Sequence, residues 1–431
     1  MNVKAFNRAR FYSHFLLSQK KMSMNNLTNS IISLAVAITL LSCSKGDDVS
    51  KEDETPNKQI PHYSYKVVHT NVTTFYDDEK IISAPGIGSS FYGQDATYPG
   101  NPPSYTDNQD GTITDNVTGL VWQQDMGEKI TFAEAETKAA SLTLGGYEDW
   151  RVPTIKELYS LILFTGQVKG ETFVEFFIDT DYFHQPIGNT ALGEREIDAQ
   201  TWSANVYVGK TMNADETAFG VNFIDGRIKG YPIYKPQQNT ANKMYFRMVR
   251  GNMEYGKNDL VDNGNETISD LATGLMWQKA DDGQFRDWEE ALAYAESLSL
   301  NGYDDWRLPS AKELHTIVDY SRSPQTSNSP AIDPLFETTE ITDPAGQPGQ
   351  YPYFWTGTTH LDGVNPYSGA VYFAFGEAQG QMNGQLMDVH GAGAQRSDPK
   401  SGNKSIYPDY HGPQGDVRYV YNAVRCVRDI E

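Results

Sequence analysis

The richest set of chemically capable side chains lies between Gly376 and Asp416, near the end of the chain. His, Arg, Asp and aromatic residues alternate there with glycine, which suits a binding surface because flat rings stack on sugars while Asp and Arg bond hydroxyls. The stretch also exceeds the ~15 residues beyond which a loop without secondary structure is usually functional or disordered. We therefore predict a ligand-binding site here. Its predicted residues are His390, Arg396, Asp398, Lys400, Asp409, Tyr410 and His411.

Two other interpretations of this segment stay open. His390 with Asp398, or His411 with Asp409, could form the acid–base pair of an enzyme that acts on a surface substrate. Alternatively, the segment is a structural Ω-loop held together by its own polar contacts. The sequence otherwise lacks catalytic motifs: it has no His-Glu-x-x-His, no Gly-x-Ser-x-Gly and no Cys/His pairing with metal-ligand spacing. We therefore predict no catalytic residue and no cofactor.

An internal repeat indicates which elements position these residues. The sequence at 146–158 (GYEDWRVPTIKEL) returns at 302–314 (GYDDWRLPSAKEL), and the phrase TGLxWQ at 118–123 returns at 273–278. The two phrases lie 28 residues apart in the first copy and 29 in the second, counted from Trp to Trp. A shared order at similar spacing indicates duplication of a whole domain. The recurring residues to which we assign structural roles are Trp122, Trp150, Arg151, Trp202, Trp277, Trp306, Arg307 and Trp355.

Each copy is predicted to be α+β, with two helices followed by short antiparallel strands. Each helix begins at an N-cap signal, an oxygen-bearing residue with Glu three positions later. Alternating apolar residues and turns such as Asp225-Gly226 predict the strands. The Asp-Trp-Arg-x-Pro phrase is an extended corner whose Trp fills the gap between the helices and whose Arg bonds an acid or loop carbonyls. The N-cap pairs are Thr131/Glu134, Thr154/Glu157, Asp287/Glu290 and Ser310/Glu313.

A calcium site receives little support from the sequence. An oxygen-rich run at 108–115 looks like a calcium loop, but Val117 stands where an EF-type loop needs its bidentate acid. The second copy also has Glu266 in place of Gly111. A β-turn that leads into a strand is the favoured interpretation, and no metal is predicted.

The N-terminus has the pattern of an export signal. Basic residues precede the apolar run Ile31–Leu41, which is too short to span a bilayer, and small residues follow it. The ending Leu40-Leu41-Ser42-Cys43 resembles a bacterial lipobox, which implies a lipid on Cys43; a plain signal peptide is the alternative. The acidic stretch after Cys43 resembles the signal that sends lipoproteins to the outer face of the outer membrane. We therefore expect a surface-exposed outer-membrane lipoprotein that contacts the membrane through this lipid.

The remaining chain is predicted to contain two globular domains. We place a signal peptide at 1–42, an acidic tether at 43–62 and an irregular N-terminal extension at 63–106, which we expect to pack on the first domain. The domains follow at 107–252 and 256–431. Without the first 42 residues, which hold five Lys/Arg and no acid, the net charge falls from −21 to −26. Such acidity disfavours nucleic acid, anionic membranes and sulfated polysaccharides as partners.

The repeated phrases resemble those of the Lcl C-terminal domain family. The resemblance rests on Thr-Gly-Leu-x-Trp, Asp-Trp-Arg-(Leu/Val)-Pro-(Thr/Ser)-x-Lys-Glu-Leu, a later Trp-(Ser/Thr) and a terminal Arg-x-Val-Arg. This set of motifs occurs twice, and the two copies together cover nearly all of residues 107–429. It implies a C-type-lectin-like fold on exported or surface proteins. The family's namesake is the tip of a collagen-like adhesin that binds sulfated glycans. This chain has no collagen repeat and is acidic, so the ligand class is not carried over.

Three functions follow from these observations. The first is a surface lipoprotein whose two lectin-like domains bind an extracellular ligand, a glycan or a surface protein. The second is an enzyme that uses the 376–416 loop. The third is a structural cell-surface or fimbria-like component without a small ligand. We favour the first.

Overall fold

The computed structural model describes residues 63–430, apart from residues 213, 236–237 and 239. The predicted signal peptide, Cys43 and the acidic tether lie outside these residues. Both copies of the repeat belong to one compact unit. In the described part of the chain, no helix combines the length and the apolar character that a bilayer crossing requires.

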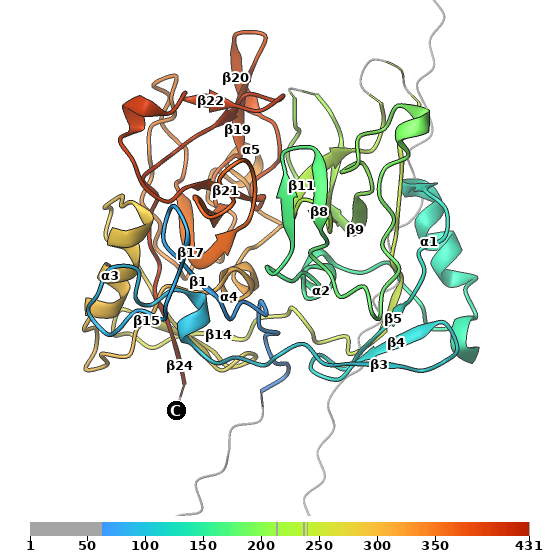
Figure 1. Ribbon diagram of the computed structural model, residues 1–431, viewed down its shortest axis with the longest axis horizontal. Coiled ribbons are helices and arrows are strands. Elements are labelled where there is room, and N and C mark those ends of the chain that lie inside the picture. The colour runs from blue at the N-terminus through green and yellow to red at the C-terminus, as the bar shows by residue number, and fades with distance from the viewer. Residues whose placement is uncertain (1–62, 213, 236–237, 239, 431) are drawn as a thin grey trace, which may run out of the picture. The chain divides into compact units, whose positions relative to one another are not determined.

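A six-stranded antiparallel sheet joins the two copies (Figure 1). Its strands are, in sheet order, β17 (Tyr353–His360), β18 (Gly369–Ala374), β21 (Gln395–Pro399), β11 (Arg227–Pro232), β10 (Thr217–Asn222) and β9 (Thr201–Val206). The junction is the pairing of Ile228 on β11 with Gln395 on β21. β9, β10 and β11 of the first copy match β17, β18 and β21 of the second. Because equivalent strands meet antiparallel at the junction, an approximate twofold axis relates the copies.

Each copy also has a four-stranded antiparallel sheet of its own, and the strand order is the same in both. In the first copy the order is β13 (Val249–Gly251), β5 (Leu120–Gln123), β4 (Thr112–Asp115) and β3 (Tyr105–Asp107). In the second it is β24 (Val427–Asp429), β16 (Leu275–Gln278), β15 (Thr267–Asp270) and β14 (Leu260–Asp262). Trp122 lies opposite Val249, and Trp277 lies opposite Val427. The turn and strand predicted at 108–115 are confirmed.

The helices begin where the N-cap signals predict. The side chains of Thr131, Thr154 and Ser310 form capping boxes with Glu134, Glu157 and Glu313. Asp287 accepts the backbone N–H of Glu290 at 2.9 Å. Together with the sheets, these helices confirm the predicted α+β class. The helices are α1 (Phe132–Ala140), α2 (Ile155–Tyr159), α3 (Trp288–Ser297), α4 (Ala311–Thr316) and α5 (Pro324–Ser327).

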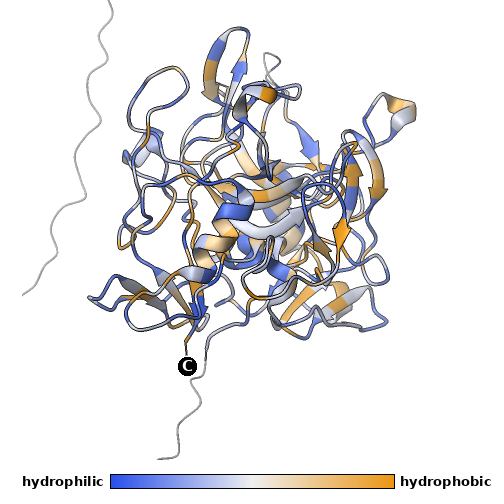
Figure 2. Ribbon diagram, turned by 60° about the vertical axis from the view of Figure 1, so that its left-hand side comes forward, coloured by the Kyte–Doolittle hydropathy of each residue, from blue (hydrophilic) through white to orange (hydrophobic). Residues whose placement is uncertain are grey.

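The hydrophobic core has one part that the copies share and two that they do not. The largest cluster draws on both copies and includes Trp122, Trp277, Phe219 and Phe373. Smaller clusters surround Trp150 and Trp202 in the first copy and Trp306 and Trp355 in the second. Figure 2 shows hydrophilic stretches in the loops around these strands and helices. The shared cluster makes each copy depend on the other for burial of apolar surface.

The segment 376–416 is not the loop without secondary structure that we predicted. It forms a four-stranded sheet with the order β20 (Gln385–Asp388), β19 (Gln379–Met382), β23 (Asp416–Val417) and β22 (Tyr410–His411). It also supplies β21 to the central sheet. The pairings within this sheet include non-local ones, such as Gly380 with Asp416, so the local sequence pattern does not reveal them.

The N-terminal extension corrects a second expectation, because it lies mostly against the second copy. Figure 1 shows it, in blue, beside β15, β17 and α3. Tyr65 N donates to Ala272 O at 3.2 Å, and Asp77 O accepts from Lys400 Nζ at 2.9 Å. Its elements are β1 (Phe75–Tyr76), β2 (Ile81–Ile82) and the 3₁₀ helix η1 (Asp95–Thr97). The other short elements are β6 (Ile130–Thr131), η2 (Leu144–Gly146), β7 (Gln167–Lys169), β8 (Thr172–Glu175), η3 (Thr190–Leu192), β12 (Lys243–Met244) and η4 (Lys404–Ile406).

Candidate functional site

The structure places His390 and Arg396, two of the predicted ligand-binding residues, in an interior ion-pair cluster. His390 Nε2 lies 2.8 Å from Asp416 Oδ1, and Arg396 is bonded to both His390 and Asp416. His390 is only 2% exposed. Burial lowers the pKa of His390 to about 4, although Asp416 opposes this shift. The acid–base interpretation required Asp398 beside His390. The acid that lies beside His390 is instead Asp416.

Asp398 and Lys400 are interior as well. Asp398 Oδ2 accepts from Tyr419 N at 3.1 Å, and burial raises the pKa of Asp398 to about 7. The Lys400 ammonium lies 4.3 Å from the ring centroid of Trp288, where burial lowers its pKa well below the usual range. Asp398 and Lys400 thus connect the end of β21 to Tyr419 and Trp288. Their assignment as ligand-binding residues stays a prediction.

The other three predicted residues lie closer to the surface. Asp409 is exposed, and Tyr410 and His411 on β22 are half-buried. Tyr410 and His411 pair with Val417 and Asp416 across the strands. Burial lowers the pKa of His411 to about 4, so the imidazole is neutral at physiological pH. A binding role for these residues also stays a prediction.

The repeated Lys-Glu-Leu phrases meet at the twofold axis, where α2 faces α4. Lys156 Nζ donates to Thr316 O at 2.6 Å, and Lys312 Nζ donates to Ser160 O at 2.8 Å. Each ammonium thus lies at the C-terminal end of the other copy's helix, where carbonyl groups lack helical partners. Burial lowers the pKa of Lys156 to about 8 and that of Lys312 to about 7. Because both copies make the same bond, we assign both lysines a structural role.

The Trp and Arg residues of the repeated corner occupy equivalent environments in both copies. Trp150 Nε1 donates to Leu144 O at 3.1 Å, and Trp306 Nε1 donates to Leu300 O at 3.4 Å. Arg151 and Arg307 pair with the capping acids Glu157 and Glu313. In each copy the corner Trp belongs to the same hydrophobic cluster as the first helix, and the corner Arg bonds an acid. The structural roles assigned to these residues stay predictions. The other recurring tryptophans, Trp122, Trp202, Trp277 and Trp355, are all fully buried.

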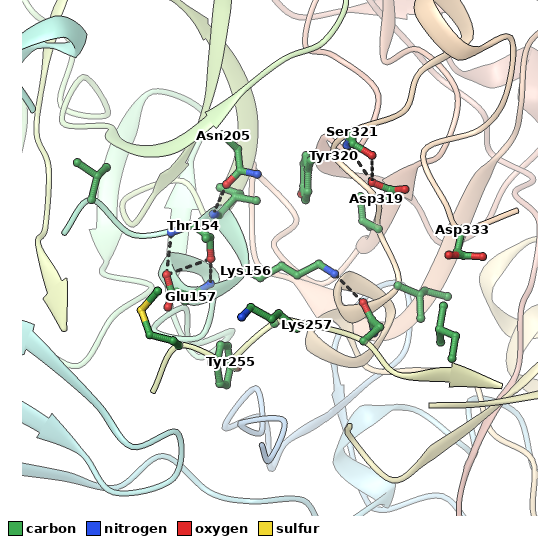
Figure 3. Close-up of a pocket in the computed structure, with 18 of the residues that line it drawn as sticks. Thr154, Lys156, Glu157, Asn205, Tyr255, Lys257, Asp319, Tyr320, Ser321 and Asp333 are labelled. Atoms are coloured by element: carbon green, nitrogen blue, oxygen red, sulfur yellow. Dashed lines mark hydrogen bonds between the residues drawn. The ribbon is translucent and has the colours of Figure 1, made fainter. Parts of the chain in front are cut away.

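A cavity of about 610 Å³ lies beside α2, between the two copies (Figure 3). We call it the open seam. One wall comes from the corner and α2 of the first copy, and the opposite wall comes from residues 317–321 of the second copy. The linker between the copies, around Tyr255 and Lys257, closes one side. The polar residues that Figure 3 shows around it are Thr154, Lys156, Glu157, Asn205, Tyr255, Lys257, Asp319, Tyr320, Ser321 and Asp333.

The equivalent place beside α4 contains part of the N-terminal extension, and we call it the filled seam. Asp95 Oδ2 accepts from Thr70 Oγ1 at 2.6 Å and from Thr358 Oγ1 at 2.7 Å. Thr70 O accepts from Phe164 N at 2.9 Å. The extension thus bridges β17 and α4 of the second copy to residue Phe164 of the first. The chain itself occupies part of one of the two symmetry-related seams, where a cavity of about 390 Å³ remains beside Arg307 and Glu313, while the other seam is open.

Comparison with protein families explains the repeat. A family model described as the Lcl C-terminal domain matches residues 111–250 and 266–390, together more than half of the chain. The chain belongs to the Lcl C-terminal domain family. The two matches also agree with the duplication inferred from the sequence. Neither the curated proteins nor the solved structures contain a match to this chain.

Two charged side chains of the open seam, between the two Lcl C-terminal domains, are held by other groups of the chain. Lys156 is committed to Thr316 O and Asn258 Oδ1, and the Glu157 carboxylate is committed to Arg151 and Thr154. These groups therefore lack the freedom that a nucleophile or a general base needs. Among residues 63–430 as described, no cluster of His, Cys, Asp or Glu has the arrangement of a metal site. Charged and neutral polar side chains on opposite walls, such as Asn205 and Asp319, suit a polar ligand.

Sequence reasoning did not find the residues of the open seam. Asn205 and Tyr320 belong to different Lcl C-terminal domains, and neither belongs to a motif. The available signal was a difference between the copies: Asn205 stands where the second copy has Thr358, and Tyr320 stands where the first copy has Phe164. These two differences can be interpreted only when the structure shows that the residues lie in the two seams.

Proposed function

We propose that this protein is a surface-exposed outer-membrane lipoprotein whose two Lcl C-terminal domains bind an extracellular ligand, a carbohydrate or a partner protein. We further propose that each domain is C-type-lectin-like. The shared order of two helices and short antiparallel strands, with the long 376–416 insertion before the last strand of the second copy, supports that assignment.

One observation carries the proposal of binding: the open seam has a filled twin. The N-terminal extension shows that a polar segment fits between these domains, with its oxygens facing Phe164 N and Thr358 Oγ1. An enzymatic function from 376–416 has less support, because both residues of one of its two candidate acid–base pairs, His390 and Asp398, are buried. A purely structural role would leave a cavity of this size and polarity without a use.

A second surface favours carbohydrate as the ligand. Phe285 and Tyr421 are 41% and 39% exposed, and they border a groove of about 250 Å³ together with Pro352 and Thr342. Exposed rings beside polar groups are the usual surface on which a sugar ring stacks. A glycan is therefore expected in this groove.

A glycan array tests the proposal and distinguishes binding in this groove from binding in the open seam. The probes are the wild-type protein, Ser321→Trp, which fills the open seam, and Tyr421→Ala, which removes one ring of the groove. Glycan retention that either substitution abolishes, at an unchanged melting temperature, supports binding at that place. If the wild-type protein retains neither glycans nor the peptides of the library described in the next subsection, the proposed function is wrong.

The membrane anchor has its own test. Cells that express the wild-type protein should incorporate labelled palmitate into it, and cells that express Cys43→Ser should not. Equal labelling of both proteins would contradict the lipid on Cys43. Cleavage of the wild-type protein by a protease added to intact cells then checks the surface exposure, and full protection would contradict it.

A further inference from the structure

The two seams differ in one backbone donor. In the filled seam, Phe164 N donates to Thr70 O at 2.9 Å. The equivalent residue in the open seam is Tyr320, which lies as far in sequence from the first residue of α4 as Phe164 lies from the first residue of α2. Among the residues that the structure describes, Tyr320 N donates to no acceptor. Tyr320 is buried and lines the cavity, so its N–H without an acceptor favours a ligand that supplies a carbonyl oxygen.

The second difference lies on the opposite wall. In the filled seam the Thr358 hydroxyl accepts from Ala311 N at 2.9 Å and donates to Asp95. In the open seam Asn205 Oδ1 accepts from Ile155 N at 2.8 Å, which is the same bond to the first residue of the helix. The Asn205 amide nitrogen then remains, and Figure 3 shows it directed toward Tyr320. In the open seam the Asn205 amide is thus the donor that corresponds to the Thr358 hydroxyl, which donates a hydrogen bond to Asp95 in the filled seam.

We propose that the open seam binds a peptide segment of a partner protein, which accepts from Tyr320 N with a backbone carbonyl and from Asn205 Nδ2 with a side-chain oxygen. The inference rests on the proposed binding function and names its ligand class. The filled seam supports a peptide over other polar ligands, because there the occupant is a peptide: Thr70 supplies the carbonyl and Asp95 supplies the side-chain oxygen. The partner segment reproduces in trans what the extension does in cis.

A random-peptide library displayed on phage tests this inference with the full-length protein. Peptides are selected on the wild-type protein and counter-selected on Ser321→Trp, whose indole occupies the cavity. We expect enriched peptides to carry Asp or Asn and to bind the wild-type protein at least about tenfold more tightly than the blocked variant. No enrichment over Ser321→Trp would overturn the proposal.

A matched pair of substitutions at Asn205 identifies the donor. Asn205→Thr recreates the arrangement of Thr358, with a hydroxyl that accepts from Ile155 N and donates outward. Asn205→Val has the same shape and no hydroxyl. We expect the Thr variant to keep the selected peptides and the Val variant to lose about tenfold in affinity, the effect of one lost hydrogen bond. Equal affinity of both variants would show that residue 205 does not contact the ligand, and would overturn the proposal.

The same experiments separate this inference from the proposed function. If no peptide is enriched but a glycan is retained by the wild-type protein and lost in Ser321→Trp, the peptide inference is wrong and ligand binding stands. If the Val variant fails to fold, as its melting temperature would show, the comparison of wild type with Ser321→Trp still decides the outcome.

Discussion

Lys312 shows how this fold accommodates a charge near its centre. The side chain is 4% exposed, and its ammonium donates to Ser160 O and His69 O. Both acceptors are backbone carbonyls without full charge, so they do not offset the loss of hydration completely. Burial therefore lowers the pKa of Lys312 to about 7. Its counterpart Lys156 shows the same effect to a smaller extent, with a pKa of about 8.

The residue-scale prediction concerns pH. The unfolded chain keeps the ordinary lysine pKa of 10.5, whereas the folded pKa of Lys312 is about 7. Between these values the unfolded state binds more protons, so this group makes the free energy of unfolding rise with pH, by at most about 1.4 kcal/mol per unit. Lys312→Met should remove that increase. Urea unfolding between about pH 7 and pH 10 measures it, with exposed Lys80→Met as the control. A pH-independent difference between wild type and Lys312→Met would contradict the shifted pKa.

At the scale of elements, the N-terminal extension acts as a part of the second domain. η1 lies against β17, and Asp95 is the acceptor through which the extension bonds Thr358. Gly357 permits this approach, because a Cβ there would lie 3.1 Å from Asp95 N. The first domain has Ala204 at that position. The equivalent strands β17 and β9 therefore differ in the segments that pack against them.

Asp95→Ala tests this role of the extension. The substitution leaves the hydroxyls of Thr70 and Thr358 without their acceptor, which should cost about 1–3 kcal/mol of unfolding free energy. It should also loosen the extension, so that trypsin cleaves faster at the exposed Lys66 and Lys80. Asp304→Ala, at an exposed position, is the control. Unchanged cleavage with unchanged stability would show that Asp95 does not hold the extension in place.

At the scale of the whole molecule, the central sheet makes the two Lcl C-terminal domains interdependent. β11 and β21 pair at the junction, and Gly230 N donates to His390 O at 2.8 Å beside it. The largest hydrophobic cluster also contains residues from both copies. Separation of the copies would expose that cluster and one edge of each half-sheet, which is unfavourable in water. The domain boundaries drawn from the sequence remain predictions, but they do not mark independent cores.

Calorimetry of Gly230→Val tests this interdependence. A Cβ at Gly230 would lie 2.8 Å from His390 O, so valine should disturb the junction and lower the melting temperature by several degrees. We expect the wild-type protein and the variant each to unfold in a single transition. Gly86→Val, where a Cβ meets no atom within 4 Å, is the control. Two separate transitions, with only one shifted by Gly230→Val, would show that the domains fold independently.

The amino-acid sequence by itself determined the duplication, the α+β class and the helix starts. These features depend on short-range physics: Thr154 and Glu157 cap α2 through contacts three residues apart, and Trp150 bonds Leu144 six residues away. The same chemistry recurs in both copies, so each local prediction could be checked against its twin.

Only the tertiary structure decided where the candidate site lies. His390 and Arg396 looked like surface groups in a glycine-rich loop, but β21 carries Arg396 into the central sheet and Asp416 neutralises it there. Asn205 and Tyr320 carry no motif, and they line one cavity because strands from separate copies pair across an axis. Contacts between residues more than a hundred positions apart depend on the packing of the whole chain, and no local pattern encodes which of two equivalent seams the extension will fill.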